Sequence, residues 1–171
     1  MGTANSNGID PEARVEELGL DLPDYSKVPY YGPNYGTMKS HHQVGDVLYL
    51  SGHIPEYPDG TALHPGHLGD DVTVEEGYEA ARLTAINCLA GIKYAIGDLN
   101  RVRSLVRSLN FVVCTPDFYE VNKVSCGATD LFLDVFGEER GLGGRATIGV
   151  TSLADNHCFE NWLTVEVETD D

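Results

Sequence analysis

Residues 73–97 carry a complete set of helix signals and constrain the fold more than any other segment. Thr73 and Glu76 have the spacing of a capping box, in which each side chain bonds the other residue's backbone N–H. Gly97 is the expected C-terminal stop. Between these signals apolar residues recur every three or four positions, which gives a helix one apolar face that must be covered. That face consists of Tyr78, Ala81, Ala85, Cys88, Leu89, Ile92 and Ile96.

The segments before this helix predict a β-hairpin. Residues 37–44 and 46–54 read as two strands, and Gly45-Asp46 between them is a tight turn. Residues 55–71 are rich in Pro, Gly and Asp and predict a long loop before the helix.

The segments after the helix predict three more strands and a second helix. Residues 102–114 are rich in β-branched and aromatic side chains and indicate a strand. Pro116-Asp117 is expected to begin a helix that extends to about Phe136, with Gly127 as a local weak point. The sequences RATIGVTSL and NWLTVEVE, residues 145–153 and 161–168, predict the last two strands.

The element order β-β-α-β-α-β-β predicts an α+β domain with two helices on one face of a mixed sheet. We assign residues 37–171 to this domain and residues 1–36 to an N-terminal extension. The first ~20 residues read as a frayed tail, and the tyrosine-rich part that follows reads as an arm on the domain or on a neighbouring subunit. The second sheet face keeps alternating apolar residues without a helix to cover them, which predicts a homo-oligomer. These residues include Val47, Tyr49, Leu109 and Phe111.

The charge balance excludes several classes of function. With 27 Asp+Glu against 11 Lys+Arg, the net charge is −16, which opposes binding to nucleic acid or to anionic membranes. The sequence shows neither an 18-residue apolar run nor the apolar core of a signal peptide, so we expect a cytoplasmic protein. The four cysteines are widely spaced and are expected to be reduced.

Two charged groups and two histidines are candidates for chemistry. Arg145 follows two glycines at the start of a strand; it is either a solvated charge or a guanidinium that grips a carboxylate. Glu166 lies in the last strand and is either part of an outward polar face or a carboxylate that orients water. His64 and His67 in HPGH are a weak zinc signal without neighbouring ligands, and we expect no metal.

Several segments taken together resemble the reactive intermediate deaminase (Rid) family, also known as endoribonuclease L-PSP or YjgF-like proteins. They are VGDVLYLSGHIP, EEGYEAARLTAINCLAGIKYAIGDLNRV, FVVCTPDFYEVNKV, GGRATIGVTSL and VEVE, which span about residues 44–168. GATDLFLDVFGE, residues 127–138, is similar to a pattern of a less studied branch of this family.

The resemblance implies a chorismate-mutase-like fold, a homotrimer with a central barrel of sheets, and ligand clefts between subunits. It implies that Arg145 binds the substrate carboxylate and that Glu166 positions water. The serine-glycine pair of the family corresponds to Ser51-Gly52, followed here by His53 in place of a glutamine. Two further substrate-binding positions are Thr147 and Tyr35. The family commonly has a cysteine at the position of Thr147. By spacing, Met38 occupies the place of the aromatic residue that closes the family's cleft, and Tyr35 lies three residues before it.

Two functions follow as expectations from this resemblance. The first is an enzyme that hydrolyses a carboxylate-bearing enamine or imine to a 2-oxo acid and ammonia, without a cofactor because the imine carbon is already electrophilic. The alternative is a trimer that binds small carboxylic acids without turnover and regulates a partner. The ribonuclease suggested by the older family name conflicts with the net charge of −16.

Overall fold

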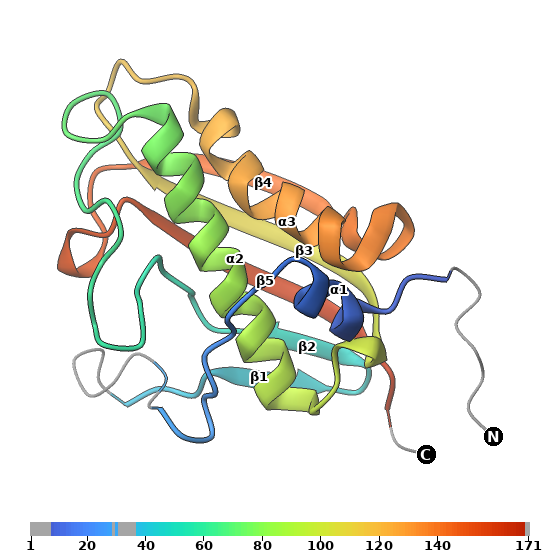
Figure 1. The fold of residues 1–171 in the computed structure, drawn as a ribbon. Helices are drawn as coiled ribbons and strands as arrows, with labels where there is room; N and C mark the ends of the chain where they lie inside the picture. Colours follow the sequence, from blue (N-terminus) through green and yellow to red (C-terminus); the bar gives the residue numbers. More distant parts are fainter. Residues whose placement is uncertain (1–7, 29, 31–36, 170–171) are drawn as a thin grey trace.

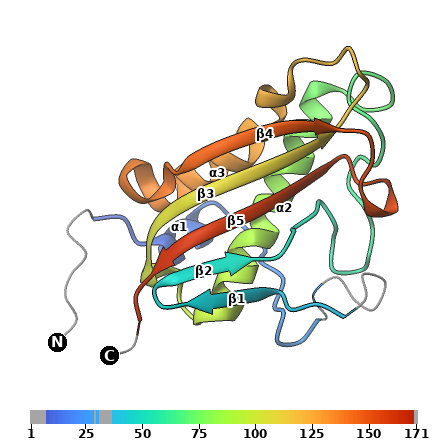
Figure 2. The ribbon, with the colours of Figure 1, turned by 180° about the vertical axis from the view of Figure 1, so that it is seen from behind.

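The computed structural model describes residues 8–28, 30 and 37–169, which form a five-stranded sheet covered by helices on one face (Figures 1 and 2). The strand order is β1-β2-β5-β3-β4, so β1 and β4 are the edges. Strands β3 and β4 run parallel and the other neighbours run antiparallel, which confirms a mixed α+β sheet. The strands are β1 (His41–Val44), β2 (Val47–Leu50), β3 (Val102–Val113), β4 (Gly144–Val150) and β5 (Phe159–Val167); the helices are α1 (Pro11–Glu17), α2 (Val74–Ile96) and α3 (Val121–Gly141), with 3-10 turns η2 (Leu99–Arg101) and η3 (Ala154–Asn156).

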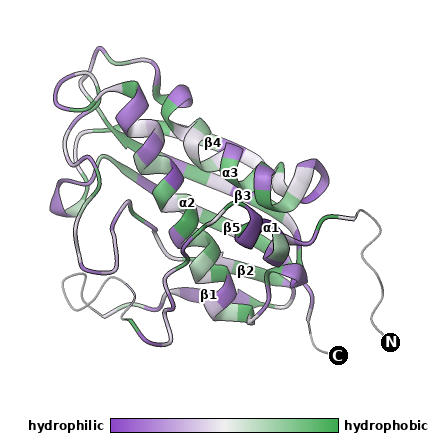
Figure 3. Ribbon diagram, in the orientation of Figure 1, coloured by the Kyte–Doolittle hydropathy of each residue, from purple (hydrophilic) through white to green (hydrophobic). Residues whose placement is uncertain are grey.

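Local signals place the hairpin turn and the first long helix where the sequence predicts them, although β1 and β2 are shorter than the strands expected at residues 37–44 and 46–54. Gly45 has a φ of 60° in the two-residue turn between β1 and β2. The capping box of α2 is complete: the backbone N–H of Glu76 donates to Thr73 Oγ1 (3.2 Å), and that of Thr73 donates to Glu76 Oε2 (2.8 Å). Gly97 ends the helix in the left-handed region with a φ of 82°. Hydrophobic and hydrophilic residues alternate along α2 and α3, as expected for helices with one covered face (Figure 3).

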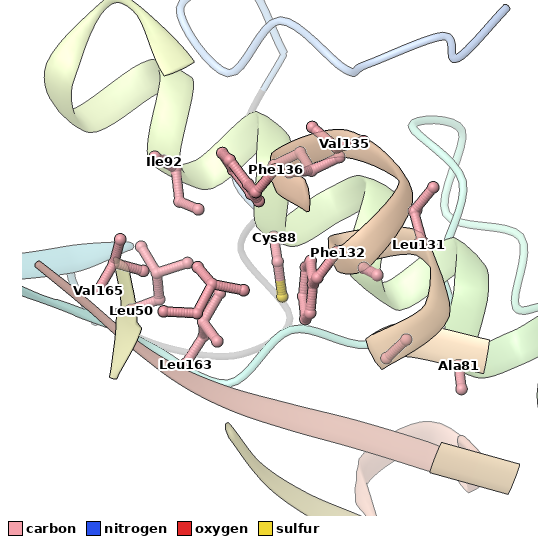
Figure 4. Close-up of a cluster of buried hydrophobic side chains, with 14 of the residues drawn as sticks. Leu50, Ala81, Cys88, Ile92, Leu131, Phe132, Val135, Phe136, Leu163 and Val165 are labelled. Atoms are coloured by element: carbon pink, nitrogen blue, oxygen red, sulfur yellow. The ribbon is translucent and has the colours of Figure 1, made fainter. Parts of the chain in front are cut away.

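The hydrophobic core lies between these two helices and the sheet (Figure 4). Cys88 of α2 is fully buried, as expected for a small core residue, and it lies among aromatic and aliphatic side chains from α3 and β5. All four cysteines are free thiols. The core residues labelled in Figure 4 are Leu50, Ala81, Cys88, Ile92, Leu131, Phe132, Val135, Phe136, Leu163 and Val165.

The second long helix departs from the sequence expectation at its start and at its break. Pro116 and Asp117 form a turn rather than the first residues of the helix, and α3 begins at Val121. The helix is continuous through Gly127, where a weak point was expected. Its non-helical residue is Gly137, with a φ of 74°.

The first helix belongs to the packed part of the molecule. Val15 is 7% exposed and joins the core, and Glu12 accepts hydrogen bonds from Lys93 Nζ (2.5 Å) and from the backbone N–H of Leu99 (2.9 Å). The expectation of a frayed tail is therefore wrong for Pro11–Glu17. A domain boundary at residue 36 stays a prediction.

Figure 2 shows the face of the sheet that no helix covers, and exposed apolar residues lie on the strands there, as the sequence predicts. Because side chains alternate along a strand, the residues between the buried positions point away from the helices. Tyr49, Ile148 and Trp162 lie on this face and are 48%, 47% and 51% exposed. None of the described helices is long and apolar enough to cross a membrane.

Candidate active site

The segment that follows β2 places Ser51 and Gly52 against the last strand. The Ser51 hydroxyl donates to the carbonyl oxygen of Lys39 (2.5 Å), which ties the segment to the residues before β1. Two residues after Ser51, His53 and Asn161 of β5 exchange both backbone hydrogen bonds at 2.9 Å. The Ser51-Gly52 pair therefore lies at the beginning of β5.

Glu160 is the carboxylate that this arrangement brings to Gly52. A Cβ atom on Gly52 would lie 2.0 Å from Glu160 Oε1, so the absence of a side chain at residue 52 lets the carboxylate rest on the backbone. Trp162 Nε1 donates a hydrogen bond to the same oxygen (2.5 Å). Burial raises the pKa of the Glu160 carboxyl above its usual value, and the bond from Trp162 opposes this shift. A carboxylate with a raised pKa beside a bare backbone is suited to proton transfer.

Glu166, the expected catalytic glutamate, lies six residues farther along β5. It accepts a hydrogen bond from the Ser104 hydroxyl (2.9 Å) and is opposite Val47 in the neighbouring strand β2. At about 3.3 Å per residue, it lies roughly 20 Å along the strand from Glu160. The structure therefore does not bring Glu166 to Ser51-Gly52.

Arg145 lies on the edge strand β4 with its guanidinium directed toward α3. Its Nη1 donates to Thr129 Oγ1 (3.0 Å) and contacts Cys126 Sγ (3.6 Å). Among the residues that the structure describes, no carboxylate forms an ion pair with it. Thr147, two residues on, faces the same helix, and its hydroxyl is 2.7 Å from that of Ser125. The α3 contacts thus fix the Arg145 guanidinium at an exposed edge, and no carboxylate of the described residues neutralises its charge. This arrangement favours anion binding.

Within one chain, Arg145 and Glu160 lie on opposite faces of the sheet. Arg145 contacts α3, on the helix-covered face. Glu160 lies between the buried residues Phe159 and Asn161 and therefore projects to the helix-free face. A site that uses both residues requires a second copy of the chain.

His53 holds the Ser51-Gly52 segment from beneath. It is fully buried, and its Nδ1 donates to the carbonyl oxygen of Ser51 (2.7 Å). Its ring lies against Tyr30 with centroids 5.1 Å apart, and the Tyr30 hydroxyl donates to the carbonyl oxygen of Gly52 (2.6 Å). Burial lowers the pKa of His53 to about 4, so the ring is neutral at pH 7.

An aromatic cleft of ≈ 620 Å³ adjoins this segment through Lys39. Met38, which spacing places at the cleft-closing position, lines it together with Tyr25, Tyr30 and Tyr94. Tyr35, the expected substrate-binding tyrosine, lies outside the described residues.

The two histidines of HPGH take part in separate contacts. His64 Nε2 is 2.9 Å from Glu79 Oε2, and His67 Nε2 donates to the carbonyl oxygen of Thr151 (3.2 Å). Within residues 8–28, 30 and 37–169, no group of three or more His, Cys, Asp or Glu side chains is placed to hold a metal ion.

Comparison with known proteins agrees with the fold and with the sequence resemblance. Residues 12–156 match the family described as "YjgF/chorismate mutase-like, putative endoribonuclease". The chain belongs to the YjgF/Rid family. Protein TCP17 of Trypanosoma cruzi is 38% identical over 155 residues, which cover 91% of this chain and 92% of that protein.

Two solved structures from bacteria resemble the chain over nearly its whole length. One, described as a putative endoribonuclease from Shewanella oneidensis, is 34% identical with a TM-score of 0.83, covering 92% of this chain and 99% of its own. The other, protein Atu1372 of unknown function from Agrobacterium tumefaciens, is 35% identical with a TM-score of 0.79, covering 92% and 94%. The fold of this YjgF/Rid family member is therefore chorismate-mutase-like.

Sequence reasoning missed Glu160, Trp162 and the partners of Arg145 on α3. Beginning the last strand at Asn161 excluded Glu160, although the alternation already starts at Phe159. Thr129 and Cys126 lie in α3, whereas Arg145 lies in the following strand β4, and no local sequence pattern links the two residues to the arginine.

Proposed function

We propose that the protein is a homotrimeric imine deaminase that hydrolyses carboxylate-bearing imines to 2-oxo acids and ammonia. Membership of the YjgF/Rid family supports this assignment. The observation that carries it is the packing of the half-buried Glu160 carboxylate on Gly52, beside Ser51. Arg145 supplies the second requirement, a guanidinium without a carboxylate partner among the described residues.

Arg145 of one subunit binds the substrate carboxylate at the interface with the subunit that supplies Glu160. A guanidinium suits this role because it forms two parallel hydrogen bonds with a carboxylate. This contact holds the neighbouring imine carbon in place for attack. The cation thus selects 2-imino acids over neutral imines. Its contacts with Thr129 and Cys126 fix the guanidinium before the substrate arrives.

Glu160 moves the protons of the reaction. It takes a proton from water as the water oxygen bonds to the carbon of the protonated imine, which gives a neutral carbinolamine. It then returns that proton to the amine nitrogen, the C–N bond breaks, and ammonia leaves. The remaining hydroxyl loses its proton to solvent and becomes the carbonyl group of the 2-oxo acid. The raised pKa of Glu160 suits both steps near neutral pH.

The experiment that tests this function is ammonia release from 2-aminoacrylate, generated in situ, by four proteins. We expect acceleration by the wild type, loss of kcat in Glu160→Gln, and loss of kcat/KM in Arg145→Ala. Glu166→Gln is the matched control and should stay near the wild type, because Glu166 lies at the other end of β5.

The opposite pattern, with activity lost in Glu166→Gln and kept in Glu160→Gln, would return the catalytic role to Glu166. No acceleration by any of the four proteins would contradict the deaminase function. A thermal-shift measurement with 2-oxobutyrate would then test the alternative of a carboxylic acid binder.

The endoribonuclease activity named in the family description is not part of this proposal. A chain with a net charge of −16 repels a phosphate backbone, and ribonucleases need cationic contacts with it.

A further inference from the structure

Trp162 is the single tryptophan of the chain and lies on the helix-free face, two residues after Glu160. Its Nε1 donates to Glu160 Oε1 at 2.5 Å. Its ring meets the ring of Phe111 of β3 edge-on, with centroids 5.2 Å apart and an interplanar angle of 64°. The hydrogen bond and the ring contact together set the orientation of the indole.

The indole N–H is a donor without acceptor capacity, and this restricts Glu160 in both of its protonation states. Oε1 must offer a lone pair to Trp162 whether the carboxyl is ionised or neutral. The carbonyl oxygen of a neutral carboxyl is a stronger acceptor than its hydroxyl oxygen, so this bond favours the proton of neutral Glu160 on Oε2. The absence of a side chain at Gly52 leaves room for this hydrogen-bonded pair, since a Cβ atom there would lie 3.0 Å from Trp162 Nε1.

The titratable groups that contact the Ser51-Gly52 segment, on which Glu160 rests, are uncharged at neutral pH. Burial raises the pKa of the Tyr30 hydroxyl, which is hydrogen-bonded to Gly52. Burial lowers the pKa of His53, on the other side of the segment, to about 4. On the neighbouring strand β3 the uncharged Phe111 is the register partner of Glu160, and on β5 the uncharged Trp162 is hydrogen-bonded to it. Among the described residues, the hydrogen bond to this carboxylate comes from Trp162.

We propose that Trp162 is a positioning residue that holds Oε1 of Glu160 and thereby makes Oε2 the oxygen that exchanges protons with substrate. This proposal rests on the proposed deaminase function for its catalytic consequence. The hydrogen bond itself is testable without turnover, because the fluorescence of a single tryptophan reports on one site.

The first measurement is tryptophan fluorescence against pH in the wild type and in Glu160→Gln. A neutral carboxylic acid and a carboxylate affect a hydrogen-bonded indole differently, so the wild-type emission should titrate with the ionisation of Glu160. The Glu160→Gln protein should lack that transition. A flat wild-type profile, or a transition that Glu160→Gln leaves unchanged, would overturn the proposal even if the enzyme is active.

The second measurement is the pH dependence of kcat in Trp162→Phe, which keeps an aromatic ring beside Phe111 and removes the N–H. Loss of a bond that favours the carboxylate raises the pKa of Glu160, so the acid limb of the profile should move to higher pH. At neutral pH kcat should fall about ten-fold with little change in KM, since proton transfer rather than binding is impaired. A wild-type profile and kcat in Trp162→Phe would overturn the proposal.

Failure of the deaminase function gives a different result. Neither the wild type nor Trp162→Phe would then accelerate ammonia release. The fluorescence transition of the wild type and its loss in Glu160→Gln would both remain.

Discussion

At the scale of single residues, Gly52 is the position where one added atom reaches the proposed chemistry. A Cβ atom would meet Glu160 Oε1 at 2.0 Å, and that oxygen is the movable end of a side chain. Gly52→Ala should therefore displace the carboxylate while the backbone stays in place. We expect kcat/KM for 2-aminoacrylate to fall at least about ten-fold and the Tm to change by less than about 3 °C. Steady-state kinetics and calorimetry measure the two effects; a large loss of Tm with full activity per folded molecule would contradict this.

His53 makes a residue-scale prediction for stability against pH. Its pKa is about 4 in the folded protein and 6.5 in an unfolded chain, so between these values the unfolded state binds more protons. Stability is therefore complete above pH 6.5 and falls as the pH drops toward 4. The shift corresponds to about 3 kcal/mol.

Urea unfolding at pH 7.5 and pH 5.0 checks this effect in the wild type and in His53→Gln. The wild type should lose more unfolding free energy than the variant on going to pH 5.0. His157, whose pKa burial also lowers, acts in the same direction in both proteins and cancels in the difference. Equal losses would show that His53 does not carry the effect.

At the scale of elements, the contact between α2 and α3 depends on Gly127. Helix propensity alone predicts that alanine at this position is better by about 1 kcal/mol. A Cβ atom there would lie 2.0 Å from the backbone oxygen of Tyr78, which cannot move without shifting α2. We therefore expect Gly127→Ala to lower the free energy of unfolding by about 3 kcal/mol.

Gly77→Ala is the matched control for this prediction. Its Cβ would meet Leu68 Cδ1 at 2.8 Å and Val124 Cγ1 at 3.1 Å, and both atoms are side-chain ends that can move. It should cost about 1 kcal/mol in the same urea experiment. A stabilised Gly127→Ala protein would show that propensity outweighs the helix contact.

The elements that the sequence predicts correctly are those whose signals are local. The capping box, the apolar period and Gly97 lie within α2 itself, and the hairpin depends on its own turn. The sequence predictions are wrong where residues far apart in the sequence determine the local structure. Gly127 is a tight helix contact rather than a break because Tyr78 lies against it, and Glu160 reaches the site because Gly52, more than 100 residues earlier, lies beside it.

At the scale of the whole molecule, an exposed apolar face and an exposed cation lie on separate surfaces. The helix-free face exposes Tyr49, Ile148 and Trp162, and the edge strand β4 presents Arg145. An exposed apolar face of this kind is typical of an interface, and a cyclic assembly uses two different surfaces of each subunit. The proposed function requires such an assembly to bring Arg145 of one subunit near Glu160 of the next, because within one chain the two residues lie on opposite faces of the sheet.

A mixing experiment tests this arrangement directly. Arg145→Ala and Glu160→Gln should each be inactive alone, since each removes one half of every site. After the two proteins are unfolded together and refolded at equal amounts, subunits combine at random. Sites that draw the arginine from one chain and the glutamate from the next should then recover about a quarter of wild-type ammonia release. Refolding each variant alone is the control. No recovery, although native mass spectrometry shows mixed trimers, would mean that one chain supplies both residues. A monomeric sedimentation coefficient for the wild type would contradict the assembly itself.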